Sequence, residues 1–189
     1  MTLIELMIVV TIIATIASIG TSMYGSALLS ARFIKAKSEL RTISLAISTY
    51  QSTHQFELPR TLADAGHGNR LDPWGFPYMY LNFHTGTGSG MQYVTEAGLI
   101  DPVAVARIKG VRLGGQGTVG AVTDAAPLDL TLIDEHKRKD RLLFPLNSDY
   151  DLFSVGPNGV SALSLGEKVS LDDVIRANDG NYFGLASKY

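Results

Sequence analysis

The first thirty residues carry an apolar pattern that has no polar face. No charged side chain occurs from Leu6 to Ala31, and the run from Leu6 to Ile19 would be apolar on every side of a helix. At ~1.5 Å of rise per residue, such a helix is long enough to cross the ~30 Å hydrocarbon core of a bilayer. The pattern therefore predicts a helical segment over residues 1–30 that lies in a membrane or in the core of an assembly.

A single acidic residue, Glu5, lies at the start of this apolar run. A carboxylate in hydrocarbon costs on the order of a few kcal/mol unless a cation pairs with it. The nearest cation is a chain-terminal ammonium, either its own or that of an identical neighbour. The alternative is a Glu at the membrane surface, solvated by headgroups.

The first cations, Arg32 and Lys35, come after the apolar run. By the positive-inside rule, this order would keep the bulk of the chain in the cytoplasm. The opposite orientation requires that a basic leader has been removed before residue 1.

Residues 31–56 have a different, amphipathic pattern. Apolar residues recur at alternating spacings of three and four, which predicts one helical stripe packed on a soluble domain. Pro59 is the latest point that the helix can reach, and Gly20 and Gly25 are places where it could loosen. The predicted core stripe consists of Phe33, Ala36, Leu40, Ile43, Ile47 and Tyr50.

Residues 57–189 show the short apolar runs and turns of a small β-domain. The patterns predict strands over 77–83 and 151–155, a turn over 156–159 and a return strand over 160–165. Residues 84–142 resemble a glycine-rich insertion with a short helix over 101–108. The expected fold class is α+β, with a long N-terminal helix packed on a small antiparallel sheet.

Composition and charge narrow the possible functions. The 189 residues include 16 basic and 18 acidic side chains, for a net charge of -2, so counterion release from nucleic acid is not expected to drive binding. With no Cys, the chain has neither disulfides nor a thiolate site. The four His residues lack a zinc-binding spacing and no nucleophile elbow occurs, so we expect no enzyme.

Two charged clusters are predicted to face solvent. The carboxylates of Asp149 and Asp151 alternate near the start of a strand and would share one face. The run from His136 to Lys139 is typical of a solvated surface.

A third cluster, Asp172 and Asp173, allows two interpretations. Paired carboxylates suit a hard cation such as Ca²⁺, which takes oxygen ligands. Alternatively, Ser170 caps a short helix that has these acids in its first turn.

Four segments together resemble the type IV pilins and the pseudopilins of type II secretion. Residues 1–10, MTLIELMIVV, resemble the mature start of these proteins. Residues 71–80, LDPWGFPYMY, are similar to the Asp-Pro-Trp-Gly segment of major pseudopilins. Residues 150–159 and 171–175 resemble their Phe-Ser-x-Gly-Pro-Asp-Gly turn and their Asp-Asp-Ile loop. The Pro that many members carry at the position of Ser22 is absent.

The resemblance implies a pilin-like fold and a way of assembling. It implies that a prepilin peptidase cuts a basic leader just before Met1, that Met1 is methylated, and that an assembly platform acts on the chain. Glu5 would then pair with the N-terminal amine of a neighbouring subunit. The chain would cross the bacterial inner membrane once, with its C-terminal domain periplasmic, and later form a periplasmic or cell-surface filament.

The resemblance also implies a calcium site formed by Asp172 and Asp173, with Asn158 at a position where the family carries Asp. The lack of Cys favours the pseudopilins over the disulfide-closed pilins. The expected function is therefore a structural subunit, the major pseudopilin of a type II secretion-like system. Alternatives are the major pilin of a surface pilus, serving adhesion, motility or DNA uptake, and a monotopic membrane-anchored binding module.

Overall fold

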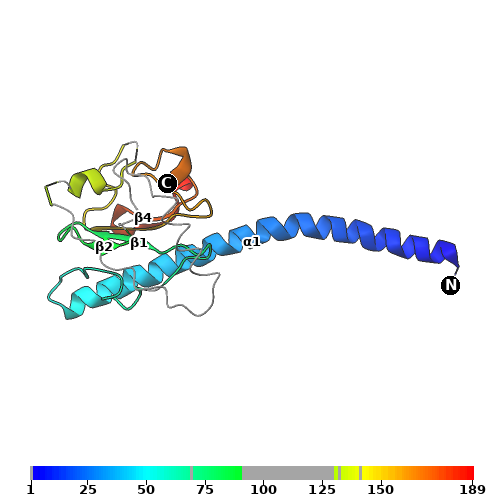
Figure 1. The fold of residues 1–189 in the computed structure, drawn as a ribbon, viewed down its shortest axis with the longest axis horizontal. Coiled ribbons are helices and arrows are strands. Elements are labelled where there is room, and N and C mark those ends of the chain that lie inside the picture. The colour runs from blue at the N-terminus through cyan, green and yellow to red at the C-terminus, as the bar shows by residue number, and fades with distance from the viewer. Residues whose placement is uncertain (1, 69, 91–129, 132, 141) are drawn as a thin grey trace. The chain divides into compact units, whose positions relative to one another are not determined.

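The computed structural model describes residues 2–68, 70–90, 130–131, 133–140 and 142–189, with backbone alone for 19–23 and 135 (Figure 1). The chain divides into two compact units, Met1–Ile34 and Lys35–Tyr189. The predicted helix over 101–108 and most of the insertion lie outside the described residues.

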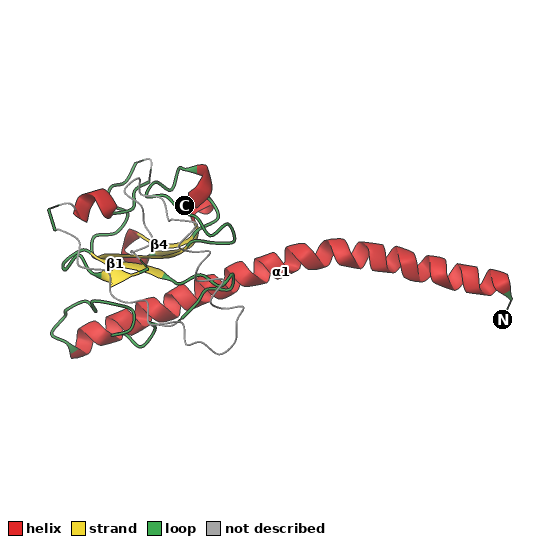
Figure 2. Cartoon of the chain, viewed as in Figure 1, coloured by secondary structure: helices red, strands yellow, loops and turns green. Residues whose placement is uncertain are grey.

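Helix α1, Leu3–Thr53, is continuous in both units (Figure 2). Its backbone stays helical through Gly20 and Gly25, so the predicted loosening does not break it. The helix ends where Gln55 and Phe56 adopt φ angles of 55° and 66°, a left-handed conformation that α-helix cannot continue through.

The second unit contains a five-stranded antiparallel sheet. Its strands are β1 (Met79–Asn82), β2 (Gly88–Ser89), β3 (Tyr150–Ser154), β4 (Val174–Ala177) and β5 (Tyr182–Leu185), in the order β2-β1-β3-β4-β5. The described residues also form four 3-10 helices, three between strands and one after β5: Ile133–His136, Lys168–Ser170, Asn178–Gly180 and Ala186–Lys188. The class is therefore α+β, as predicted. β1 lies inside the predicted strand 77–83, and β3 is shifted by one residue from the predicted strand 151–155.

One face of the sheet is covered by the C-terminal part of α1. The Ser44 hydroxyl lies 2.9 Å from the Tyr150 hydroxyl of β3, and Tyr78 donates a 2.6 Å hydrogen bond to Glu39. Of the predicted stripe, Ala36, Leu40, Ile43 and Ile47 are fully buried, whereas Phe33 and Tyr50 are half-buried. We call this side of the sheet the helix face.

The opposite side of the sheet, which we call the far face, carries a second core. Cross-strand partners Met79, Phe153 and Ile175 project from it, because paired residues in adjacent strands share a face. The remaining members of this core are Phe76, Leu146, Val155, Leu165, Ala177 and Ala186.

Two expectations about the C-terminal third are wrong. Residues 160–165 do not form a return strand; they contribute only an isolated bridge from Ser164 to Lys139. No helix begins at Ser170, because the chain turns there and enters β4 four residues later. The physical reason is that β4 fills the place beside β3, while Ser161 and Ala162 bind Arg138 on the far face.

Candidate functional site

The N-terminus of α1 is closed by a reciprocal pair of hydrogen bonds. The backbone N–H of Thr2 donates to Glu5 Oε2 at 2.7 Å, and the N–H of Glu5 lies 3.4 Å from Thr2 Oγ1. This is a capping box, which satisfies donors that a helix start leaves without partners. Both residues are exposed, so the Glu5 carboxylate stays accessible to a cation. Met1 lies outside the described residues, and its predicted pairing with Glu5 stays a prediction.

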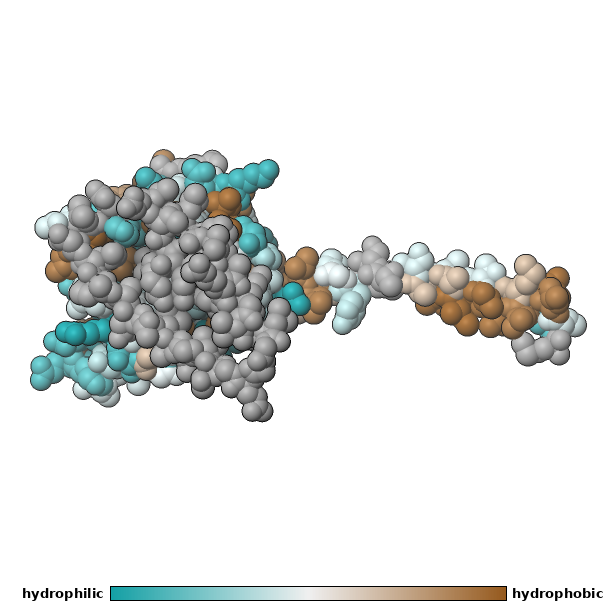
Figure 3. Space-filling view, in the orientation of Figure 1, coloured by the Kyte–Doolittle hydropathy of each residue, from teal (hydrophilic) through white to brown (hydrophobic). Residues whose placement is uncertain are grey.

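The first four turns of α1 present an apolar surface. Ten large apolar side chains between Leu3 and Ile16 are 47% to 78% exposed, and they form the brown band along the helix in Figure 3. The hydroxyls of Thr11 and Thr15 are turned back onto carbonyls of the preceding turn, at 2.6 and 2.8 Å. Glu5 is thus the one charged side chain described on this surface. The exposed residues are Leu3, Ile4, Leu6, Met7, Ile8, Val9, Val10, Ile12, Ile13 and Ile16.

Within the described residues, we find no helix that is both long enough and apolar enough to cross a membrane. The single-pass arrangement stays a prediction.

The three residues of the predicted calcium site lie close together but do not form a set of ligands. The Asn158 side chain donates a 2.7 Å hydrogen bond to Asp172 Oδ1, and the Asn158 backbone N–H lies 3.2 Å from Oδ2. The Asp173 carboxylate is instead buried, with Oδ2 2.5 Å from Nη2 of Arg138 and in contact with the Ser161 hydroxyl.

This arrangement does not fit a calcium ion. Calcium takes six to eight oxygens, whereas Asn158 directs an amide N–H at Asp172 and a guanidinium already supplies the positive charge at Asp173. Asp173 Oδ1 has no hydrogen-bond partner among the described atoms, but one free oxygen is not a site. No group of three or more acidic or His side chains that could hold a metal occurs in the described part of the chain.

Arg138 overturns the expectation of a solvated cluster over 136–139. Its side chain is 2% exposed, pairs with Asp173 and lies 4.0 Å from the ring centroid of Phe153. The guanidinium also donates to Ser161 Oγ and to the carbonyl of Ala162. These hydrogen bonds, all made through Nη2, offset part of the cost of removing the cation from water, whereas Nε and Nη1 have no hydrogen-bond partner among the described atoms.

Asp149 and Asp151 do not share a solvent-facing surface either. Asp151 is 2% exposed. Its Oδ2 accepts the backbone N–H of Arg138 at 2.8 Å, and this hydrogen bond holds the loop that contains Arg138 against β3. Asp149 is half-buried and forms a two-pronged 2.8 Å ion pair with Arg176. Burial raises the pKa of the Asp151 carboxyl, and the hydrogen bond from Arg138 opposes that rise.

Asp72 has a structural role within the resemblance segment. Its Oδ1 accepts the backbone N–H groups of Trp74, Gly75 and Phe76 at 2.8 to 3.0 Å, and its Oδ2 accepts the Ser154 hydroxyl at 2.6 Å. This carboxylate therefore ties the loop before β1 to the end of β3. Burial raises its pKa, and the four hydrogen bonds act in the opposite direction.

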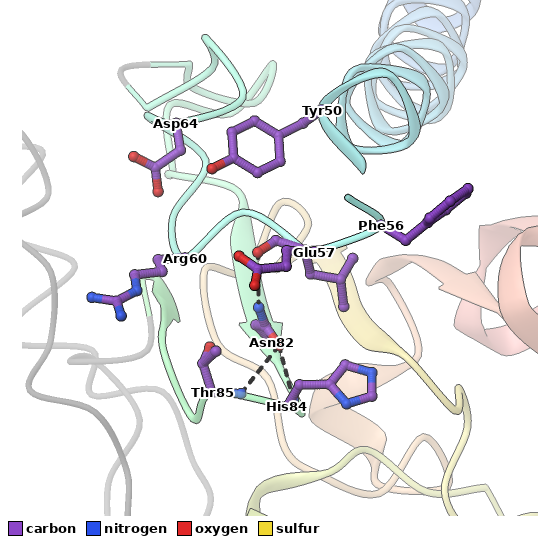
Figure 4. Close-up of a pocket in the computed structure, with 9 residues that line it drawn as sticks. Tyr50, Phe56, Glu57, Arg60, Asp64, Asn82, His84 and Thr85 are labelled. Atoms are coloured by element: carbon purple, nitrogen blue, oxygen red, sulfur yellow. Dashed lines mark hydrogen bonds between the residues drawn. The ribbon is translucent and has the colours of Figure 1, made fainter. Parts of the chain in front are cut away.

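A cavity of about 510 Å³ opens beside the end of α1 (Figure 4). Asn82, which is fully buried, builds its floor: its amide donates to the carbonyls of Leu58 and Pro59, and its Oδ1 accepts the N–H groups of His84 and Thr85. The rim carries charges of both signs and the Tyr50 ring. The lining residues are Tyr50, Phe56, Glu57, Leu58, Arg60, Asp64, Asn82, His84 and Thr85.

A second, shallower groove of about 420 Å³ runs along α1 between Thr42 and Thr53, and Tyr50 and Asp64 border both hollows. It lies between the helix and the loop that contains Asp64, Ala65 and His67. We call it the helix groove.

No family model, no curated protein and no solved structure matches the chain. The pilin resemblance therefore depends on the four sequence segments alone.

Sequence reasoning missed the buried polar groups that organise the second unit. Arg138 and Asp173 are 35 residues apart in the chain, and no local pattern marks them as partners. Asp72 offered a signal, because an Asp two residues before Trp-Gly is typical of a side chain that caps a turn.

Proposed function

We propose that this chain is the structural subunit of a pilin-like filament that assembles through the N-terminal part of α1. One observation carries the proposal: ten large apolar side chains lie exposed over the first four turns of the helix. An apolar surface of this extent marks a contact with protein or lipid. Identical helices packed side by side would cover it.

The state of Glu5 supports assembly between identical chains. Its carboxylate caps its own helix, yet stays exposed, so it can also pair with a cation from a neighbour. An amine brought against Glu5 in an apolar bundle would be strongly attracted, since the local dielectric is low there. The pair would fix the axial step between subunits.

Before assembly, the apolar segment would lie in the bacterial inner membrane, with the second unit in the periplasm. Within the filament class, we favour the major pseudopilin of a type II secretion-like system, with a surface pilus as the alternative. Loss of a secreted protein on deletion would indicate the former, and long filaments at native expression the latter.

The test compares the native chain with Glu5→Val and Glu5→Gln in cells that make the filament. We expect all three proteins in the membrane fraction, and filaments containing the chain by electron microscopy of sheared material for the native protein alone. Glu5→Gln keeps the size and one capping acceptor but removes the charge. Normal filaments from both variants would refute the pairing, and a native chain that stays monomeric in every condition would refute the filament.

A further inference from the structure

The loop before β3 presents three consecutive large apolar side chains to solvent. Leu142, Leu143 and Phe144 are 92%, 51% and 56% exposed. A run of three exposed apolar residues is unfavourable in a soluble surface unless it serves a contact. We call these three residues the apolar knob.

The knob is held rigidly on the far face of the sheet. The N–H of Leu146 donates to the carbonyl of Arg138 and the N–H of Asp140 donates to the carbonyl of Leu143, both at 2.9 Å. Leu146 is buried in the far-face core, and the buried Arg138–Asp173 pair anchors the other side of the loop. A contact element fixed in this way loses little conformational entropy when it binds.

The helix groove offers a matching surface on the other side of the same unit. It is lined mainly by apolar and methyl-bearing side chains, and Leu45 in it is 69% exposed. Figure 1 shows the segment around residue 140, in yellow-green, on the opposite side of the sheet from the end of α1, in cyan. The lining residues are Thr42, Leu45, Ala46, Thr49, Tyr50, Thr53, Asp64, Ala65 and His67.

An exposed charge of opposite sign lies beside each surface. Lys139 is exposed beside the knob, where its neighbour Asp140 is half-buried, and Asp64 is exposed at the groove. A knob that docked in the groove of another chain would bring these opposite charges to the same rim.

We propose that the apolar knob of one copy of this chain docks in the helix groove of the next copy. Two different surfaces on opposite sides of one molecule form a heterologous contact, which repeats without closing unless a rotation closes a ring. This inference rests on the proposed filament, and it places a second subunit contact in Lys35–Tyr189, apart from the helix bundle.

The absence of Cys allows a direct test by site-specific cross-linking in the full chain. Leu143→Cys is placed in the knob and Leu45→Cys in the groove, both at exposed positions where the fold should tolerate the change. Filaments of the double variant are treated with a short bismaleimide and analysed on a denaturing gel. We expect a ladder of dimers, trimers and higher multimers, because each chain carries one cysteine in the knob and one in the groove.

Two controls make the result specific. Each single variant alone should give no ladder beyond dimers, whereas a mixture of the two singles should give a dimer of one of each. The matched pair Leu45→Cys with Glu167→Cys, also exposed, should give about tenfold less ladder, because these positions are not held together.

Filaments that form without a ladder, or that cross-link equally with the control pair, would overturn the docking and leave the filament function intact. A ladder obtained without filaments would support the docking and count against the filament. Absence of both would overturn both.

Discussion

The two units of this chain arrange apolar and charged residues in opposite ways. In Met1–Ile34, large apolar side chains such as Ile4 and Ile16 face outward and the one described acid is exposed. In Lys35–Tyr189, Arg138, Asp151, Asp173 and Arg176 are buried beside the apolar core.

The contrast indicates which unit accommodates its own apolar and charged side chains without a second molecule. Among the described residues of the second unit, Arg138 pairs with Asp173, Arg176 pairs with Asp149, and Asp151 accepts a backbone N–H. These charges therefore find partners within the fold, although Nε and Nη1 of Arg138, Oδ1 of Asp173 and Nε of Arg176 have no hydrogen-bond partner there. The apolar surface of the first unit has no such cover within its own unit, and its free energy is lowered only when another surface buries it. We therefore expect the first unit to make the contacts between molecules, and the contacts within the second unit to determine its stability.

A charge placed on the apolar surface of the first unit should abolish assembly and leave folding unchanged. Ile13→Lys puts a charge on the apolar surface, where an unpaired cation costs ~2.5–3.5 kcal/mol or more at the centre of an apolar layer. We expect filaments to be lost while the unfolding midpoint of the second unit, followed by Trp74 fluorescence in detergent, stays the same. Ile13→Leu is the control and should assemble normally. Filaments from Ile13→Lys would mean that this surface is not buried in the assembly.

The converse change should affect folding first. Arg138→Met removes the cation and leaves the Asp173 carboxylate buried without its partner, which costs ~3–5 kcal/mol in comparable buried pairs. Urea unfolding followed by Trp74 fluorescence measures the loss. Lys139→Met, one residue away and exposed, should change stability by less than about 0.5 kcal/mol. Equal effects of the two substitutions would show that the buried pair contributes little.

The pH dependence of stability should come from the second unit. Burial raises the pKa of Asp173 from 3.8 to about 7, against the opposing charge of Arg138. The folded state then binds a proton more readily than the unfolded state, so this contribution is present below pH ~4 and is lost as the pH rises through about 7. We expect the unfolding midpoint to fall between pH 5 and pH 8.

The matched variant is Asp173→Asn, which should have a lower midpoint overall but a flatter pH profile. The raised pKa values of Asp72 and Asp151 also favour the folded state at low pH, so the unfolding midpoint of this variant should still fall somewhat as the pH rises. A midpoint that rises across this range would indicate that Arg138 keeps Asp173 ionised in the folded state.

The smallest expected effect concerns calcium. Because the Asp173 carboxylate is already paired with Arg138, a chelator should shift the melting temperature of the second unit by less than about 1 °C. Addition of millimolar Ca²⁺ should be equally without effect. A drop of several degrees on chelation would restore the calcium site that the resemblance implies.

Local patterns predicted much of the fold. The stripe Ala36, Leu40, Ile43 and Ile47 was predicted from spacing alone and is fully buried, and the strands around Met79 and Phe153 were found by composition. These signals are strong because each lies in a short stretch of chain. The pilin resemblance and the role of Glu5 stay predictions.

What failed depended on contacts between distant residues. The segment 160–165 has the composition of a strand, but more than one segment could pair with β3. In the structure β4 pairs with β3, and 160–165 makes only an isolated bridge with Lys139. The cluster around Arg138 was judged by its polarity, whereas its burial depends on Asp173, Ser161 and Phe153 from three other segments.

Local patterns in the chain were enough to predict the long helix, the change from an all-apolar to an amphipathic pattern near residue 31, and the α+β class, since periodicity and side-chain hydrophobicity are local properties. The folded arrangement was needed to show which charges are buried, that a guanidinium lies at Asp173 where a metal was expected, and that an apolar knob and a groove lie on opposite sides of one sheet. The reason is physical: burial and ion pairing are properties of the space around a side chain, and that space is assembled from residues far apart in the chain.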